Sequence, residues 1–288
     1  MKGKIIKGIG GFYYVQTPTE IIECKARGLF RKTKESLLVG DDVDIEPSGE
    51  KGKGFITKIY PRKNELIRPA VSNIDQILLL FALESPKPNF NLLDRFLVML
   101  EHKGLPVIIG FNKSDLDNSA IPEAENYRNI GYSVFFFSAH HSDLSSLRKL
   151  LHGKTTALAG PSGTGKSTLV NLWQKEIQME VGGVSEKIGR GKHTTRHVNL
   201  IPLDEESFIV DTPGFTTLEL SDLNSREIKH YFPDFSSYAD GCQFLDCLHD
   251  KENKCAVKAA VQEGKIWKSR YESYLQLKEQ QTRNNNYR

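Results

Sequence analysis

One segment of the chain has the residue types and the spacing of a phosphate-binding loop. Residues 160–167 read GPSGTGKS and fit the pattern GxxxxGK[ST]. The glycines let backbone N–H groups turn inward toward phosphates, the lysine can reach the terminal phosphates, and the last serine can bind Mg²⁺. We expect a strand before the loop and a helix after it, whose positive end attracts anions. The expected nucleotide ligands are Gly160, Pro161, Ser162, Gly163, Thr164, Gly165, Lys166, Ser167 and Thr168.

A second phosphate-site element follows farther along the chain. Asp211 ends an apolar stretch and Gly214 comes three residues later, which is a DxxG arrangement. We expect Asp211 to hold the Mg²⁺ shell, usually through water, and the Gly214 N–H to contact the γ-phosphate. DxxG alone is typical of an ordinary turn. Its place on a strand after a phosphate loop favours the Mg²⁺ role.

A third element predicts which base the site accepts. The NKxD pattern is formed by Asn112, Lys113, Ser114 and Asp115. The Asp115 carboxylate can accept two hydrogen bonds from guanine, whereas adenine offers no donors there and would leave a buried carboxylate unpaired. Asn112 would support the loop, and the stem of Lys113 would pack on the base. Ser138 and Ala139 follow another strand and are expected to bring a backbone N–H near guanine O6. A P-loop ATPase or kinase is the alternative that Asp115 disfavours.

The order of these elements is itself informative. Ordinary GTPases run from the phosphate loop through DxxG to NKxD and the SA loop. Here NKxD at 112 and SA at 138 come first, followed by the phosphate loop at 160 and DxxG at 211. One cyclic shift accounts for every position, so we predict a circularly permuted G domain that binds GTP and GDP with Mg²⁺.

A cluster of thiols lies near the C-terminus. The spacing Cys-x4-Cys-x-His-x5-Cys supplies three thiols and one imidazole, and four such ligands form a closed structural zinc site. Disulfides or buried reduced thiols are the alternatives, which an odd number of local cysteines disfavours. The predicted zinc ligands are Cys242, Cys247, His249 and Cys255. Cys24 is isolated and is expected in a core.

The elements that must position these residues fall into three regions. Residues 1–66 show five short strand candidates, which suit a small all-β barrel of either the OB or the SH3-like type. In residues 67–220 strands alternate with helices, which predicts an α/β parallel sheet whose last two strands form a hairpin. Residues 221–288 read as mostly helical around the cysteine-rich loop, with Lys268–Gln281 as the last helix.

Composition sets limits on the class of protein. The 288 residues are 39% hydrophobic and 26% charged, as in a folded globular chain. The net charge of +3 is too small to predict nucleic-acid binding. Basic clusters at 27–34, at 187–196 and from Lys254 to Arg270 are either solvated faces or phosphate contacts. The sequence shows no secretory signal and no apolar run of roughly 20 residues, so we expect a cytoplasmic protein without a membrane segment.

These motifs, with the N-terminal barrel and the C-terminal cysteine cluster, resemble the RsgA family, also called YjeQ or YloQ. Its members are circularly permuted GTPases that depend on the small ribosomal subunit. The resemblance implies an OB-fold barrel, a permuted G domain and a zinc domain. It also implies binding to the 30S subunit and its rRNA late in maturation, with GTP hydrolysis stimulated there. We expect a monomer. The alternative is an rRNA-binding module in which GTP is a structural ligand.

The resemblance extends to the segment GRGKHTTR at 189–196, which is similar to the switch I pattern G-x-HTT of the family. Thr195, favoured over Thr194, is then expected to bind Mg²⁺ and the γ-phosphate. Many GTPases orient the attacking water with a glutamine after DxxG, but Phe215 stands there. His193 is therefore the candidate catalytic residue, because a neutral imidazole can accept a hydrogen bond from water. The alternative is that His193 only contacts rRNA.

Overall fold

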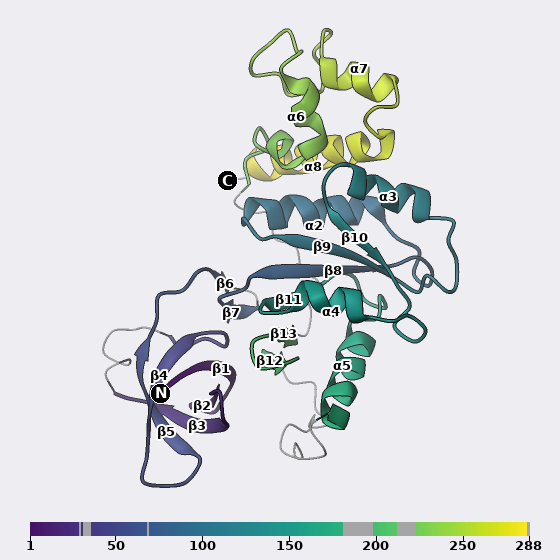
Figure 1. The fold of residues 1–288 in the computed structure, drawn as a ribbon. Helices are drawn as coiled ribbons and strands as arrows, with labels where there is room; N and C mark the ends of the chain where they lie inside the picture. The colour runs from purple at the N-terminus through teal and green to yellow at the C-terminus, as the bar shows by residue number, and fades with distance from the viewer. Residues whose placement is uncertain (29, 31–35, 68, 181–197, 212–222, 287–288) are drawn as a thin grey trace. The chain divides into compact units, whose positions relative to one another are not determined.

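The computed structural model describes residues 1–28, 30, 36–67, 69–180, 198–211 and 223–286, and Figure 1 draws their fold. The chain forms two compact units. One comprises Met1–Leu80 with Phe137–Phe215, and the other comprises Phe81–Phe136 with Thr216–Arg288. In the described part of the chain, no helix is both long and apolar enough to cross a membrane.

The first unit begins with a five-stranded barrel (Figure 1). Its strands are β1 (Lys2–Ile9), β2 (Phe12–Gln16), β3 (Ile21–Ala26), β4 (Asp42–Pro47) and β5 (Lys53–Ile59). Hydrogen bonding runs β1–β2–β3–β5–β4 and returns from β4 to β1, so the sheet closes on itself. This closed five-stranded ring is OB-like, as the family resemblance implied. Cys24 lies fully buried in its core, as predicted.

An ion pair beside the barrel is hydrogen-bonded to the hairpin that follows it, β6 (Glu65–Ile67) and β7 (Ala70–Ser72). Arg62 donates to the fully buried Asp41 carboxylate through Nε at 2.7 Å and Nη2 at 2.9 Å. Ser72 adds a hydroxyl bond of 2.7 Å to the same carboxylate. Gly40 has φ +97°, and a Cβ there would lie 2.1 Å from the Ser72 carbonyl oxygen. The chain therefore requires glycine beside this ion pair.

The same unit continues into a parallel sheet. Its strands are β8 (Gln76–Ala82), β11 (Thr155–Ala159), β13 (Phe208–Asp211) and β12 (Asn199–Pro202), with helices α4 (Ser145–Leu151) and α5 (Lys166–Glu180). β11 pairs in parallel with β8 and with β13, whereas β12 pairs with β13 antiparallel. The predicted parallel sheet, with an antiparallel hairpin as its last two strands, is thus confirmed. The expected edge position of the hairpin is wrong, because β12 also pairs with β1 of the barrel at Asn199 and Lys7. All residues of β8 are buried, in keeping with the apolar run that follows Gln76.

The second unit contains α2 (Phe90–His102), β9 (Val107–Asn112), α3 (Ile121–Asn129) and β10 (Ser133–Phe136), and β10 pairs in parallel with β9. Its C-terminal part consists of η1 (Ile228–Tyr231), α6 (Pro233–Ala239), α7 (Ala256–Gln262) and α8 (Lys268–Asn286). The Asn89 side chain caps α2 by accepting from the Leu92 N–H. The C-terminal region is therefore helical, as predicted.

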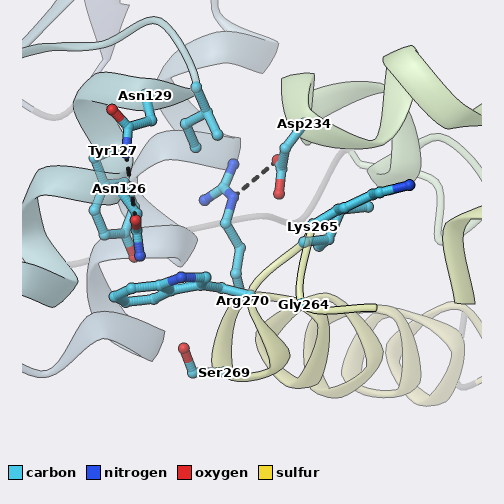
Figure 2. A pocket seen from close by; sticks show the side chains of 11 residues that line it. Asn126, Tyr127, Asn129, Asp234, Gly264, Lys265, Ser269 and Arg270 are labelled. Carbon is cyan, nitrogen blue, oxygen red and sulfur yellow. Dashed lines mark hydrogen bonds and ion pairs between the residues drawn. The ribbon is translucent and has the colours of Figure 1, made fainter. Parts of the chain in front are cut away.

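Arg270 of α8 is buried, although its sequence position suggested an exposed basic face. Its Nη1 donates to Asp94 of α2 at 2.5 Å, and its Nε donates to Asp234 of α6 at 2.9 Å, the bond marked in Figure 2. Tyr127 donates to the same Asp94 oxygen at 2.8 Å, and the guanidinium lies 4.7 Å from the centre of the Phe232 ring. Arg270 therefore joins helices of one compact unit and is not a surface contact.

Candidate functional site

The phosphate loop lies between β11 and α5, as the sequence predicted. Gly160, Gly163 and Gly165 have φ of +126°, +81° and +95°, conformations that other residues rarely adopt. A Cβ at Gly160 would lie 2.0 Å from the Leu80 carbonyl oxygen. The glycines of the pattern are therefore required by the backbone path as well as by the approach of a phosphate.

The side chains of this loop are arranged around its own carbonyl groups. The Lys166 ammonium donates to the carbonyl oxygens of Gly160 at 2.8 Å and Pro161 at 2.5 Å, and burial lowers the pKa of Lys166. Thr164 is buried and donates to the Pro161 carbonyl at 3.1 Å. Ser167, the predicted Mg²⁺ ligand, is exposed. Lys166 is thus held at the loop, in reach of a phosphate bound there.

Asp211 lies at the same edge of the sheet as the phosphate loop. β13 ends at Asp211 and runs parallel to β11, which leads into Gly160, so both carboxyl ends meet at one edge. Asp211 also lines a cavity of about 770 Å³ together with Lys7 and Tyr14 of the barrel. Three predicted residues, His193, Thr195 and Gly214, lie outside the described residues.

The NKxD segment lies in the second unit at the end of β9. The Asn112 side-chain oxygen accepts from the Lys113 N–H at 2.8 Å, and the Asn112 carbonyl accepts from the Leu83 N–H at 2.9 Å. Lys113 has φ +63°, and its ammonium donates to the Ser85 carbonyl oxygen. Asp115 is exposed, so its burial would have to come from a bound base. The loop therefore presents Asp115 on a backbone that Asn112 fixes.

The SA loop follows β10 and belongs to the first unit. Ser138 and Ala139 are buried, whereas His140 is exposed. The Ser138 N–H donates to the Ser142 hydroxyl at 2.8 Å, and the Ser138 carbonyl accepts from the Ser142 N–H at 2.9 Å. These two bonds close a tight turn that fixes the backbone at the predicted contact point.

The four predicted zinc ligands converge. Their ligand atoms all lie within 4.8 Å of one another. The Cys242 sulfur lies 3.8 Å from the Cys255 sulfur and 3.6 Å from His249 Nδ1, and His249 Nδ1 lies 3.3 Å from the Cys255 sulfur. Tetrahedral zinc, with Zn–S near 2.3 Å and Zn–N near 2.0 Å, requires about 3.8 Å between sulfurs and about 3.6 Å between sulfur and nitrogen. The three cysteines of the cluster are free of disulfides, as is Cys24, and the spacing would fit one structural zinc ion with His249 Nδ1 as a ligand.

Backbone contacts hold the zinc-ligand loop in shape. His249 has φ +55°, and its carbonyl accepts from the Tyr271 hydroxyl at 2.7 Å. The Glu252 carboxylate accepts from the Leu248 N–H at 2.7 Å and the Asp250 N–H at 2.8 Å. Burial opposes the charge of Glu252, but these backbone donors outweigh it and lower its pKa to about 2. The loop therefore has a fixed geometry supported by residues beyond the ligands.

Comparison with known families decides where this set of elements belongs. Residues 59–221 match the model described as RsgA GTPase, and residues 2–56 match that of the RsgA N-terminal domain. The chain belongs to the RsgA GTPase family. It is accordingly a P-loop GTP hydrolase with an OB-like barrel, a central G domain and a helical C-terminal region.

Similar RsgA proteins span nearly the whole chain. The small ribosomal subunit biogenesis GTPase RsgA of Alkaliphilus metalliredigens is 48% identical over 280 residues, and the match covers 96% of each chain. That of Agathobacter rectalis is 47% identical over 298 residues, covering 97% of this chain and 98% of the relative. Among solved structures, YloQ, a circularly permuted GTPase, matches with 39% identity and a TM-score of 0.77 over 98% of this chain and 94% of that one. YjeQ from Thermotoga maritima matches with 33% identity and a TM-score of 0.81 over 98% of both.

Some contacts around the RsgA motifs had no sequence signal. Ser85 reaches Lys113 through a backbone carbonyl, which any residue type supplies. The supporting role of Tyr271 likewise depends on a contact between residues 22 positions apart. Only the residues that match a motif could be predicted. The groups that orient them, such as Ser85 before α2 and Tyr271 on α8, carry no characteristic sequence.

Proposed function

We propose that the protein hydrolyses GTP to GDP and phosphate on the small ribosomal subunit and acts in the late maturation of that subunit. The observation that carries this proposal is the meeting of the phosphate loop and Asp211 at one edge of a parallel sheet, in a chain of the RsgA family. The small ribosomal subunit is proposed as the partner because the similar proteins are small ribosomal subunit biogenesis GTPases. Guanine is the base that the NKxD segment would accept.

In this proposal the nucleotide and Mg²⁺ have separate sets of ligands. Lys166 exchanges its two loop carbonyl groups for the β- and γ-phosphates, which are stronger acceptors because they are charged. Ser167, Thr195 and Asp211 would hold Mg²⁺, which would neutralise charge on the phosphates. Asp115 binds the guanine edge, and the backbone of Ser138 and Ala139 lies near guanine O6.

The proposed hydrolytic group is His193. Phe215 has no polar atom with which to orient water, so another side chain must do so. A neutral His193 accepts a hydrogen bond from the water whose oxygen attacks the γ-phosphorus, while the bond to the β–γ bridging oxygen breaks. Gly214 and Thr195 contact the γ-phosphate and complete the site.

The remaining parts are proposed to dock on the subunit. We propose three functional domains, an OB domain at 1–66, a G domain at 67–220 and a zinc domain at 221–288, the last stabilised by one structural zinc ion. The barrel and the zinc domain would contact rRNA, and the protein would act as a monomer. A ribosomal site of action would also place it in the cytoplasm.

The test is GTP hydrolysis at several concentrations of purified 30S subunits, with ATP as the control substrate. We expect turnover to rise with 30S concentration and to saturate, and we expect ATP to be a poor substrate. His193→Ala should bind GTP normally and lose the stimulated rate. Turnover that does not respond to 30S subunits would contradict the proposal and favour GTP as a structural ligand. Stimulated turnover that survives in His193→Ala would overturn the role of that residue alone.

A further inference from the structure

A row of exposed side chains crosses the outer surface of the barrel. The strand registers place Ile9 opposite Phe12, Phe12 opposite Lys25, and Lys25 opposite Phe55, on β1, β2, β3 and β5. Directly opposite residues share one face of a sheet, and Cys24, the neighbour of Lys25, points into the core instead. Ile9 is 42% exposed, Phe12 37% and Phe55 39%, and Lys25 is also exposed.

Packing of the barrel core does not explain why these apolar side chains lie on the outer surface. Single exposed apolar residues are ordinary, but three apolar side chains on neighbouring strands of one face, with one lysine among them, are typical of an interaction surface. Strands lie about 4.8 Å apart, so Phe12 and Phe55, two strands apart, stand about 10 Å from each other. Lys25 lies between them, and its ammonium is 4.9 Å from the centre of the Phe12 ring. Two aromatic rings thus flank one positive charge.

The charge around the row favours an anionic partner. Three carboxylates on the neighbouring strands and turn are already engaged. Glu23 accepts from the Tyr14 hydroxyl at 3.0 Å, Glu46 pairs with Arg27, and Glu50 pairs with Lys53. Lys53, the hydrogen-bond partner of Glu50, and more weakly the charge of Lys25 lower the pKa of Glu50. The Lys25 ammonium itself lies over the Phe12 ring, where it can meet an anionic group of a ligand beside the two phenyl rings.

We propose that this row binds single-stranded RNA, with one unpaired base stacked on Phe12, a second on Phe55, and the intervening phosphate at Lys25. Aromatic rings beside a basic side chain are the usual means of binding unpaired nucleotides, since every base offers a flat face. An apolar protein partner would have to desolvate Lys25 in the middle of the contact, which is unfavourable. The inference deepens the proposed function and rests on rRNA being the partner.

The experiment compares the binding of two RNA chains, one with bases and one without, to the full-length protein. A labelled short uridine oligoribonucleotide and an abasic chain of the same length are titrated by fluorescence anisotropy at low salt. The wild type should bind the uridine chain more tightly. Phe12→Leu with Phe55→Leu keeps apolar side chains but removes the rings, and should weaken uridine binding roughly tenfold or more, toward the abasic affinity. Phe12→Trp with Phe55→Trp should retain binding, and the matched control Ile67→Ala, at a site 84% exposed, should behave as wild type.

Lys25→Met should weaken both chains and lower the salt dependence by about one phosphate contact. Equal binding of both chains by the wild type, or wild-type affinity in the leucine variant, would overturn the inference. Hydrolysis with 30S subunits is measured on the same preparations. If 30S subunits stimulate wild-type hydrolysis and the leucine variant shows wild-type RNA affinity and hydrolysis, the row is rejected as an RNA-binding surface. The proposed function then still stands. Absence of stimulation in the wild type would reject the function, while the RNA titration would still decide the role of the row.

Discussion

Lys166 donates a hydrogen bond of 2.8 Å to the carbonyl oxygen of Gly160, six residues earlier in the same loop. Backbone carbonyl groups of the phosphate loop thus position the Lys166 side chain. Burial lowers the pKa of Lys166, which means that it disfavours the charged ammonium. A bound anionic phosphate would offset this loss of hydration. The contact also explains how the ammonium can move to a phosphate by exchanging one acceptor for another.

Replacing Lys166 by alanine should therefore weaken GTP binding strongly. Loss of charge-assisted hydrogen bonds to phosphate corresponds to about 1.5–3 kcal/mol, or roughly tenfold to a hundredfold in affinity. The measurement is a titration with a fluorescent GTP analogue. Lys175→Ala, an exposed lysine on the same helix, is the matched control and should bind as wild type. Equal affinities for the two variants would contradict the proposed role of Lys166.

The proposed zinc site predicts how many thiols react with a thiol reagent. A bound zinc ion would shield Cys242, Cys247 and Cys255, whereas burial, with the charge of Glu23, raises the pKa of Cys24 to about 11 and keeps its thiol unreactive. A thiol reagent at pH 8 should find no reactive cysteine in the native protein, three after a zinc chelator, and four in denaturant.

The matching variants separate the two kinds of cysteine. Cys24→Ala should still bind one zinc ion per chain, and Cys242→Ser should bind zinc much more weakly and unfold its C-terminal region at lower temperature. Three reactive thiols in the native protein before any chelator is added, or unaltered zinc content in Cys242→Ser, would rule out the site.

The ion pair of Arg62 with Asp41 should stabilise the barrel. Arg62→Met leaves the fully buried Asp41 carboxylate without its cation, which costs about 3 kcal/mol. Adding Asp41→Asn should restore part of the loss, because the uncompensated charge is removed. Lys63→Met breaks an exposed pair with Asp75 and should cost less than about 1 kcal/mol. Urea denaturation of the three variants measures these differences. Equal losses for Arg62→Met and Lys63→Met would show that burial does not matter here.

Features that depend on residues close together in the chain could be predicted from the sequence. The phosphate loop between a strand and a helix, the β12–β13 hairpin and the zinc-ligand set each depend on residues close together in the chain. The closure of the barrel could not be predicted, since it rests on the distant pairings of β1 with β4 and of β3 with β5. The OB type came from the family resemblance.

Arg270 shows the same limit for single residues. In the sequence it lies within a basic stretch that suggested a solvated or rRNA-facing surface. In the structure its guanidinium is buried between Asp94 and Asp234, which lie 176 and 36 positions away. Sequence pattern does not reveal a burial that depends on two distant carboxylates. The exposure of Asp115 was likewise not foreseen, because its burial depends on the base itself.

The central claim is that a base-recognition segment preceding the phosphate loop selects the nucleotide which that loop holds. Asp115→Asn tests it most directly, because an amide can donate to the 2-oxo group of xanthine but cannot accept two hydrogen bonds from guanine. Binding of GTP and XTP is measured for wild type, Asp115→Asn and the neighbouring control Asp117→Asn. We expect Asp115→Asn to lose GTP affinity by roughly a hundredfold and to gain XTP affinity, with the control unchanged. Wild-type GTP preference in Asp115→Asn would contradict the account.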